Sequence, residues 1–171
     1  GFIPRDALLD VATATVTTSA AHGYANGDYV LITANGMRQI DGRVFRVSAS
    51  ASTTFVLEGE NTTGYDAFTG GTVQKITFGT SIGTMLTVNA AGGEFDFIDT
   101  TTIHATGRTQ IPGLPSASVY NFDNIWDVTD AGLLAMKNAT DLQVKRCFKF
   151  TFGIGGPIMV FNGYPACSLL P

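Results

Sequence analysis

Hydrophobic and polar residues alternate with a period of two in short stretches between Asp10 and Lys75, and turn-forming residues separate these stretches. This period turns every second side chain to one face, so it predicts half-buried strands. The turns contain Asn26-Gly27-Asp28 and Asp41-Gly42, whose residue types accept the backbone angles of sharp reversals. The predicted strands are residues 10–19, 28–33, 42–50 and 53–60, and a short strand after Gly70-Gly71. Without a helical period here, residues 10–75 are expected to form a small all-β module.

From Ile76 onward the pattern combines strands with a long loop. Residues 76–90 are strand-like, and residues 90–107 are predicted to be a loop flanked by strand. Residues 118–128 alternate strictly and predict a strand with two distinct faces. One face holds Val119, Asn121, Asp123 and Ile125, and the other holds Tyr120, Phe122, Asn124 and Trp126.

One helix and a closing hairpin are expected after this strand. Thr129 or Asp130 can cap the start of the helix, and Asn138 is a plausible stop. Residues 144–152 and 157–164 predict paired strands; the turn between them contains Gly153, Gly155, Gly156 and Pro157. The chain is therefore expected to be mainly β (α+β), with a second domain over residues 76–171 to which residues 1–9 can contribute.

The low fraction of charged residues indicates that copies of this chain associate with one another. Charged residues make up 14% of the chain, against roughly 25% in an average soluble domain. The net charge is −4 and no basic patch is visible, which argues against a nucleic-acid clamp. The nearest approach to one is Lys145, Arg146 and Lys149, which fits a solvated or interface strand.

Membrane insertion and secretion are not expected from this sequence. No apolar run approaches the roughly 20 residues needed to cross a bilayer. Residues 1–10 lack the basic region and the apolar region of a signal peptide. They also lack an initiator Met, so one expectation is that the N-terminus has been trimmed. Cys147 and Cys167 cannot make a disulfide scaffold and are expected to be free thiols.

Candidate catalytic and metal-binding residues are few. His22 is expected to serve a turn, and neither it nor His104 has a ligand at a spacing that indicates a metal site. Cys147 has no nearby histidine to act as a base. Glu94, Asp96 and Asp99 form one acidic cluster, but calcium loops place ligands around a glycine turn, and phenylalanines separate these acids. We expect no catalytic residue, metal or cofactor.

Residues 95–139 carry a combination of motifs that resembles a known family. The motifs are Ile98-Asp99-Thr100-Thr101, Thr106-Gly107-Arg108 and Ile111-Pro112-Gly113-Leu114. Followed by a strand, a short helix and a closing hairpin, they resemble the tail tube proteins of siphophages, the phages with long non-contractile tails. The resemblance covers about residues 76–165. It implies a tail-tube-type β-sandwich or barrel.

Residues 22–75 carry a second resemblance. Their pattern is His-Gly-aromatic-x-Asn-Gly-Asp, then Asp-Gly-Arg, Thr-Phe-x-Leu and Phe-Thr-Gly-Gly-Thr-Val. This pattern resembles a small β-module that recurs in phage tail and virion proteins. It implies that residues 10–75 are an insertion or an N-terminal decoration of the tube domain.

The family resemblance implies a structural role and no enzymatic activity. Tail tube proteins form hexameric rings that stack into a hollow cylinder in the virion tail, and they assemble in the host cytoplasm. The resemblance further implies a closed inner barrel of shared strands, a long loop that reaches the next ring (residues 90–117 here), and a lumen through which DNA slides without binding. The lumen candidates are Glu94, Asp96 and Asp99. The implied partners are other copies, the tape measure, the terminator and the distal tail protein, and no membrane.

Two departures from the family pattern concern the C-terminal region. The family usually has one more strand after the last hairpin, whereas this chain stops at SLLP, and many relatives carry a C-terminal immunoglobulin-like domain. Alternatives stay open: a tail terminator or baseplate ring, a host glycan-binding module using Tyr24, Tyr65 and Phe68, or a cell-wall hydrolase using the acidic cluster.

Overall fold

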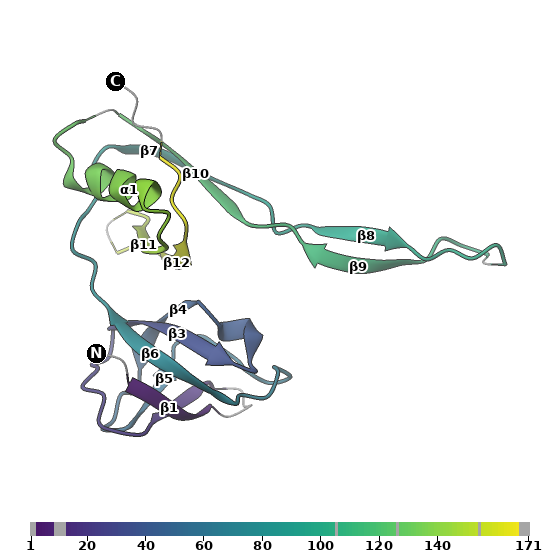
Figure 1. The fold of residues 1–171 in the computed structure, drawn as a ribbon, viewed down its shortest axis with the longest axis horizontal. Helices are drawn as coiled ribbons and strands as arrows, with labels where there is room; N and C mark the ends of the chain where they lie inside the picture. The colour runs from purple at the N-terminus through teal and green to yellow at the C-terminus, as the bar shows by residue number, and fades with distance from the viewer. Residues whose placement is uncertain (1–2, 9–12, 105, 126, 154, 168–171) are drawn as a thin grey trace. The chain divides into compact units, whose positions relative to one another are not determined.

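The computed structural model describes residues 3–8, 13–104, 106–125, 127–153 and 155–167. The chain forms two compact units, one of residues 1–80 and 135–171 and the other of residues 81–134 (Figure 1). Strands dominate, and the described residues contain one α-helix, α1 (Ala131–Asp141). The expected mainly β class with one short helix is confirmed.

Six antiparallel strands close into a small barrel in the first unit. The strands are β1 (Ile3–Leu8), β2 (Thr15–Thr18), β3 (Tyr29–Asn35), β4 (Val44–Ser48), β5 (Thr54–Leu57) and β6 (Gly70–Ile76). Their order is β1-β2-β5-β4-β3-β6, and pairing of β1 with β6 closes the circle. Closure leaves no strand edge free to pair with another chain. The period-two pattern predicted the other five strands, but it did not predict β1.

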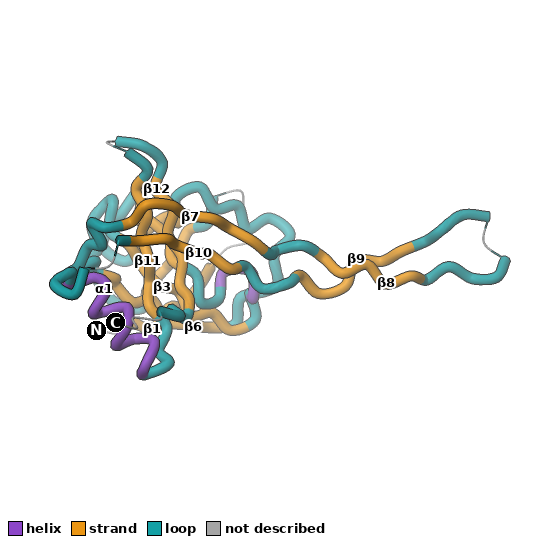
Figure 2. Tube along the Cα trace, turned by 90° about the horizontal axis from the view of Figure 1, so that it is seen from above, coloured by secondary structure: helices purple, strands orange, loops and turns teal. Residues whose placement is uncertain are grey.

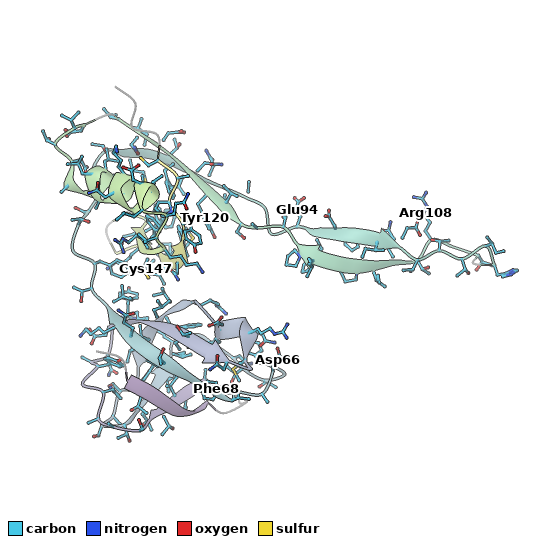
Figure 3. All side chains as sticks on the ribbon, viewed as in Figure 1. Asp66, Phe68, Glu94, Arg108, Tyr120 and Cys147 are labelled. Atoms are coloured by element: carbon cyan, nitrogen blue, oxygen red, sulfur yellow. The ribbon has the colours of Figure 1, made fainter. Side chains whose placement is uncertain are left out.

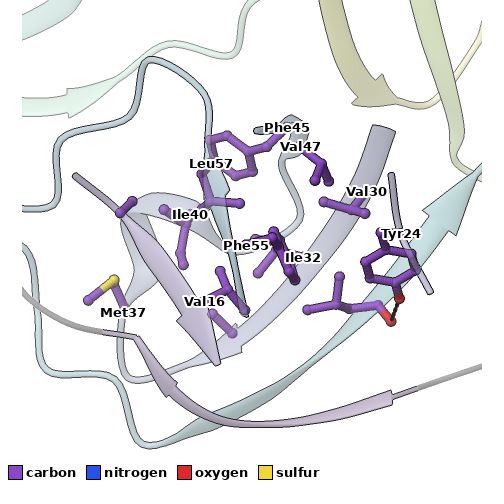
Figure 4. Close-up of a cluster of buried hydrophobic side chains, with 13 residues drawn as sticks. Val16, Tyr24, Val30, Ile32, Met37, Ile40, Phe45, Val47, Phe55 and Leu57 are labelled. Carbon is purple, nitrogen blue, oxygen red and sulfur yellow. Dashed lines mark hydrogen bonds between the residues drawn. The ribbon is translucent and has the colours of Figure 1, made fainter. Parts of the chain in front are cut away.

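The barrel encloses a single apolar core. Along β3, Val30, Ile32 and Ala34 point inward and are buried, while the residues between them are more exposed. Burying each large aliphatic or aromatic side chain of this kind contributes about 1.5–3 kcal/mol. The core cluster shown in Figure 4 comprises Ala14, Val16, Tyr24, Val30, Ile32, Ala34, Met37, Ile40, Phe45, Val47, Phe55, Leu57 and Val73.

His22 belongs to this core as a structural residue. Its Nδ1 accepts the Tyr24 N–H at 3.0 Å, and its Nε2 lies 3.2 Å from the Thr54 carbonyl oxygen. The ring stacks on Tyr24 and meets the edge of Phe55, with centroid distances of 4.8 and 5.2 Å. A ring that accepts at Nδ1 and donates at Nε2 is the neutral Nε2–H tautomer. His22 therefore holds the turn into the barrel, as the sequence predicts.

The connection between β3 and β4 uses left-handed backbone at two glycines. Gly36 has φ +85° and Gly42 has φ +68°. Between them lies one 3-10 turn (Arg38–Ile40), which the strand pattern did not predict. The Asp41 carboxylate accepts the Ala34 N–H at 2.9 Å, so the connection is fastened back to β3.

Three ion pairs lie on the barrel surface. Arg43 pairs with Glu60, Arg46 with Glu58 and Lys75 with Asp28. Exposed pairs of this kind contribute little stability, about 0–1 kcal/mol each. In barrel residues 13–76, no large hydrophobic side chain is exposed. These barrel residues therefore present a polar surface to solvent.

The rest of the first unit contains the end of α1 and the hairpin of β11 (Arg146–Thr151) and β12 (Ile158–Gly163). Phe148 and Phe150 stack on Phe161, with centroid distances of 5.4 and 5.6 Å. Asn162 Nδ2 donates to the Gly42 carbonyl at 3.2 Å, which ties the hairpin to the barrel. The predicted hairpin is confirmed.

The second unit is a long two-stranded ribbon (Figure 2). It contains β7 (Met85–Ala91), β8 (Phe95–Asp99), β9 (Gln110–Pro115) and β10 (Val119–Asn124). β7 pairs with β10 and β8 with β9, both antiparallel. In β10 one face is half-buried and the other is exposed, which confirms the predicted alternation. Trp126, assigned to the half-buried face, lies outside the described residues.

Asp130 provides the cap of α1. Its Oδ1 accepts the N–H groups of Gly132 at 2.7 Å and Leu133 at 3.0 Å. The helix then continues past Asn138, the predicted stop, and ends at Asp141. The stop lies further on because Gln143, with φ +51°, is the residue that leaves the helical conformation. An ion pair from Lys137 to Asp141 spans the last turn.

We predict that Phe55→Ala lowers the free energy of unfolding by about 3–5 kcal/mol, since Phe55 is completely buried in the barrel core. Phe97→Ala is the matched control, because Phe97 is 63% exposed and its loss should change stability by less than about 0.5 kcal/mol. Urea unfolding followed by circular dichroism measures both variants. Equal losses would contradict the assignment of the core.

We also predict that Gly36→Ala destabilises the barrel more than Gly42→Ala. Both substitutions place a side chain in left-handed backbone, at about 1–2 kcal/mol. A Cβ at Gly36 would also collide with the Ala67 carbonyl oxygen, whereas a Cβ at Gly42 meets nothing within 4 Å. Thermal melting compares the two variants, and equal melting temperatures would contradict the close approach.

Candidate functional site

The predicted signature residues and acids all fall in one segment, residues 93–116, which we call the arm. Glu94 precedes β8, which contains Asp96, Ile98 and Asp99. Thr100, Thr101, Thr106, Gly107 and Arg108 lie in the loop that follows, and Ile111, Pro112, Gly113 and Leu114 lie on β9. The structure therefore gathers these residues on one hairpin, and the roles assigned to them remain predictions.

The arm has more regular structure than the sequence predicts. Residues 90–117 were expected to form a long loop, yet both β8 and β9 form. Phe95 pairs with Pro115 and Phe97 with Pro112, so two β9 residues face one β8 residue at Gly113-Leu114. Such a bulge tolerates proline in a strand. A Cβ at Gly113 would come 2.8 Å from the Asp96 carbonyl oxygen, which favours glycine there.

The three acids of the arm do not share one face. Side chains alternate along β8, so Phe95, Phe97 and Asp99 lie on one face. Asp96 lies on the other face, and continued alternation puts Glu94 beside it. The Ser116 N–H donates to the Glu94 carbonyl at 2.8 Å, so the ladder does extend to Glu94.

A short turn organises the start of the arm loop. The Asp99 carboxylate accepts the Thr101 N–H at 2.9 Å, and the Thr109 N–H donates to Thr101 Oγ1 at 3.1 Å. Hydrogen bonds from the Thr101 side chain and from its N–H lower the pKa of Asp99. The Ile-Asp-Thr-Thr motif therefore makes local turn chemistry, with Asp99 as an acceptor.

The arm exposes an unusual amount of apolar surface. The exposed fractions are 63% for Phe97, 95% for Ile103 and 88% for Leu114. A two-stranded hairpin has no second layer to cover such side chains and is marginally stable alone. Exposed patches of this kind mark interaction surfaces. The large hydrophobic side chains exposed in the second unit are Leu86, Phe95, Phe97, Ile98, Ile103, Ile111, Leu114, Val119, Ile125, Val128 and Leu134.

Sequence reasoning missed these apolar residues as candidate contacts. It weighed the acids in residues 94–99 and treated the phenylalanines between them only as an argument against a calcium loop. The alternation of Phe95, Phe97 and their charged neighbours was a usable signal for an exposed strand.

Groups that could carry catalysis are not assembled in the described structure. His22 is buried in the barrel and His104 is exposed on the arm loop. Cys147 and Cys167 are free, and burial raises the pKa of both thiols, which makes them weaker nucleophiles. No three His, Cys, Asp or Glu side chains in the described ranges are placed to hold a metal ion.

Three other sequence hypotheses concern surface residues. Tyr24 is buried, and Tyr65 and Phe68 pack against the barrel core, so these aromatics form no exposed sugar platform. Lys149 Nζ lies 5.2 Å from the centre of the Tyr29 ring, which engages it in a local contact.

Among the described residues, no helix is long and apolar enough to cross a membrane.

We predict that Thr101→Val raises the pKa of Asp99 toward its ordinary value, because it removes one of two hydrogen bonds that favour the carboxylate. The lowered pKa also means that ionised Asp99 stabilises the turn above its ordinary pKa, and that this contribution is lost as pH falls through the lowered value. Thr102→Val is the control. NMR titration of the Asp99 carboxyl carbon measures the shift, and an unchanged pKa in Thr101→Val would contradict the assignment.

Comparison with known proteins identifies a family. The sequence model of the family described as phage tail tube protein, TTP, matches residues 35–171, which is most of the chain. The match begins at the end of β3 and includes β4 to β6, the whole arm and the C-terminal hairpin. No curated protein matches the chain.

Proposed function

The chain belongs to the phage tail tube protein family, and from this premise we propose that its copies form hexameric rings that stack into the tube of a long, non-contractile siphovirus tail. Membership of the family gives the protein a structural role in the tail tube of a bacteriophage virion. The finer features, namely hexamers, stacking and DNA ejection, are the proposal.

The observation that carries the proposal is the uncovered ribbon of the second unit. Many of its large hydrophobic side chains are exposed, whereas barrel residues 13–76 expose none of comparable size. β7, β8, β9 and β10 each pair with a single strand in the described structure, so each keeps one open edge. Open edges accept strands from neighbouring copies, and a closed ring of copies removes them.

The arm is the element that reaches the adjacent ring in this proposal. An isolated hairpin is marginally stable, so the arm gains order when a neighbouring copy covers it. Contacts that form only on assembly make stacking cooperative and limit premature polymerisation. Contacts with the tape measure, terminator and distal tail proteins complete the tail during assembly in the host cytoplasm.

DNA passes through the lumen of the proposed tube without specific binding. The net charge of −4 disfavours phosphate binding, which depends on cationic side chains and counterion release. If β8 lines the lumen, alternation turns either Glu94 and Asp96 or Asp99 toward the DNA. Glu94, Asp96 and Asp99 therefore remain lumen candidates as two alternative sets.

We further propose that residues 10–75 act as an outward-facing β-module and residues 76–171 as the tube domain. In support, the barrel core residues that the structure describes all lie between Ala14 and Val73. Its ion-paired surface is typical of a module that faces solvent. β1 completes this barrel from outside the 10–75 segment.

We predict that the purified protein forms stacked tubes in negative-stain electron microscopy. A variant with residues 100–109 replaced by Asn-Gly should form no tubes. Asp99 and Gln110 are direct partners, so a two-residue turn closes the shortened hairpin without strain. Circular dichroism of the variant should retain the barrel melting transition.

Two results would contradict the proposal. Single rings that never stack, formed by the unmodified protein, would instead support a tail terminator or baseplate ring. If the shortened variant forms normal tubes, the proposed tube function stands, but the proposed role of the arm in ring stacking is wrong.

A further inference from the structure

Opposite charges lie at the two ends of the arm. Glu94 lies at its inner end with Asp96 two residues further on, and Arg108 lies toward its outer end (Figure 3). All three side chains are exposed. Within the described ranges, none of the three takes part in an ion pair. The arm therefore carries separated charges that its own fold does not use.

These charges cannot pair within one arm. β8 contributes five residues between the two ends, and a strand rises about 3.3 Å per residue, which gives about 16 Å. An ion pair needs an N···O distance of about 4 Å or less. Asp99 is the acid nearest to Arg108 along the ladder, yet its carboxylate accepts the Thr101 N–H and forms no ion pair with Arg108 in the described structure.

Each charge has an exposed apolar neighbour. On the face that carries Asp96, Ile98 and Ile111 form a cross-strand pair, and they are 55% and 52% exposed. In the loop with Arg108, Ile103 is 95% exposed. The outer end thus presents a cation and an aliphatic side chain, and the inner end presents anions and an aliphatic pair. The two ends are complementary in both charge and hydrophobicity.

We propose that the outer end of one arm docks on the inner end of the arm of a second copy, in the adjacent ring. Arg108 binds Glu94 and Asp96 of that copy, and Ile103 packs against its Ile98 and Ile111. This contact rests on the proposed tube function and specifies the partner surface. It joins two different surfaces, so it repeats in one direction along a stack.

The same charges give the stack its polarity. Two outer ends would bring arginines together, and two inner ends would bring carboxylates together. Like charges placed opposite each other disfavour an interface. Head-to-tail docking of arms is therefore the arrangement that pairs Arg108 with Glu94 and Asp96.

The test uses charge reversal in the full chain. Arg108→Glu alone, and Glu94→Lys with Asp96→Lys, should each raise the critical concentration for tube formation by about tenfold or more, because each places like charges at the contact. An equimolar mixture of the two variants should form tubes again, since each outer end then meets an inner end of opposite charge. Asp66→Lys, an exposed acid on the barrel, is the matched control and should assemble normally.

The outcomes separate this contact from the tube function itself. If the unmodified protein forms tubes and either charge-reversal variant forms them equally well, the contact is wrong while the tube function stands. Failure of the mixture, with both variants showing the barrel melting transition, also overturns the contact. If the unmodified protein forms no tubes, the proposed function fails and the contact fails with it.

Discussion

A two-stranded ribbon has no second layer, and this constraint governs the arm, residues 93–116. Alternate side chains of a strand point to opposite faces, so a ribbon with hydrophobic residues on both faces exposes all of them. Phe97 on one face of β8 and Ile98 on the other are both more than half exposed. These side chains cannot be covered by the two strands that carry them. In the proposed tube, neighbouring copies provide the missing layer.

The barrel solves the same problem within one chain. Its sheet closes on itself, so every strand has two neighbours and one face of the sheet encloses the core. The buried polar atoms of the His22 and Tyr24 side chains all form hydrogen bonds with backbone groups. The chain thus joins a barrel that buries its hydrophobic side chains to a ribbon that leaves many of its own exposed. In the proposed tube, this contrast separates the folded barrel from the part that assembles.

Several elements followed directly from sequence because their signals are local. Alternation in residues 28–33 and 53–60 identified β3 and β5, and Asp130 before an apolar run identified the cap of α1. Other elements were missed because their stability comes from pairing. β1 contains proline, and it is a strand because β2 and β6 lie on either side of it. β9 contains two prolines and a glycine, and a bulge opposite β8 allows it to pair.

The sequence by itself determined the mainly β class, the position of the helix and the motifs of the tail tube family. These depend on residue periodicity and local hydrogen bonding, which the order of residues contains. Only the tertiary structure decided which strands close into a barrel and which form a ribbon. It also placed Asp99 on the face opposite Asp96, and it separated Arg108 from Glu94 along the arm. The physical reason is that strand pairing and exposure depend on contacts between residues distant in the chain, which no local pattern specifies.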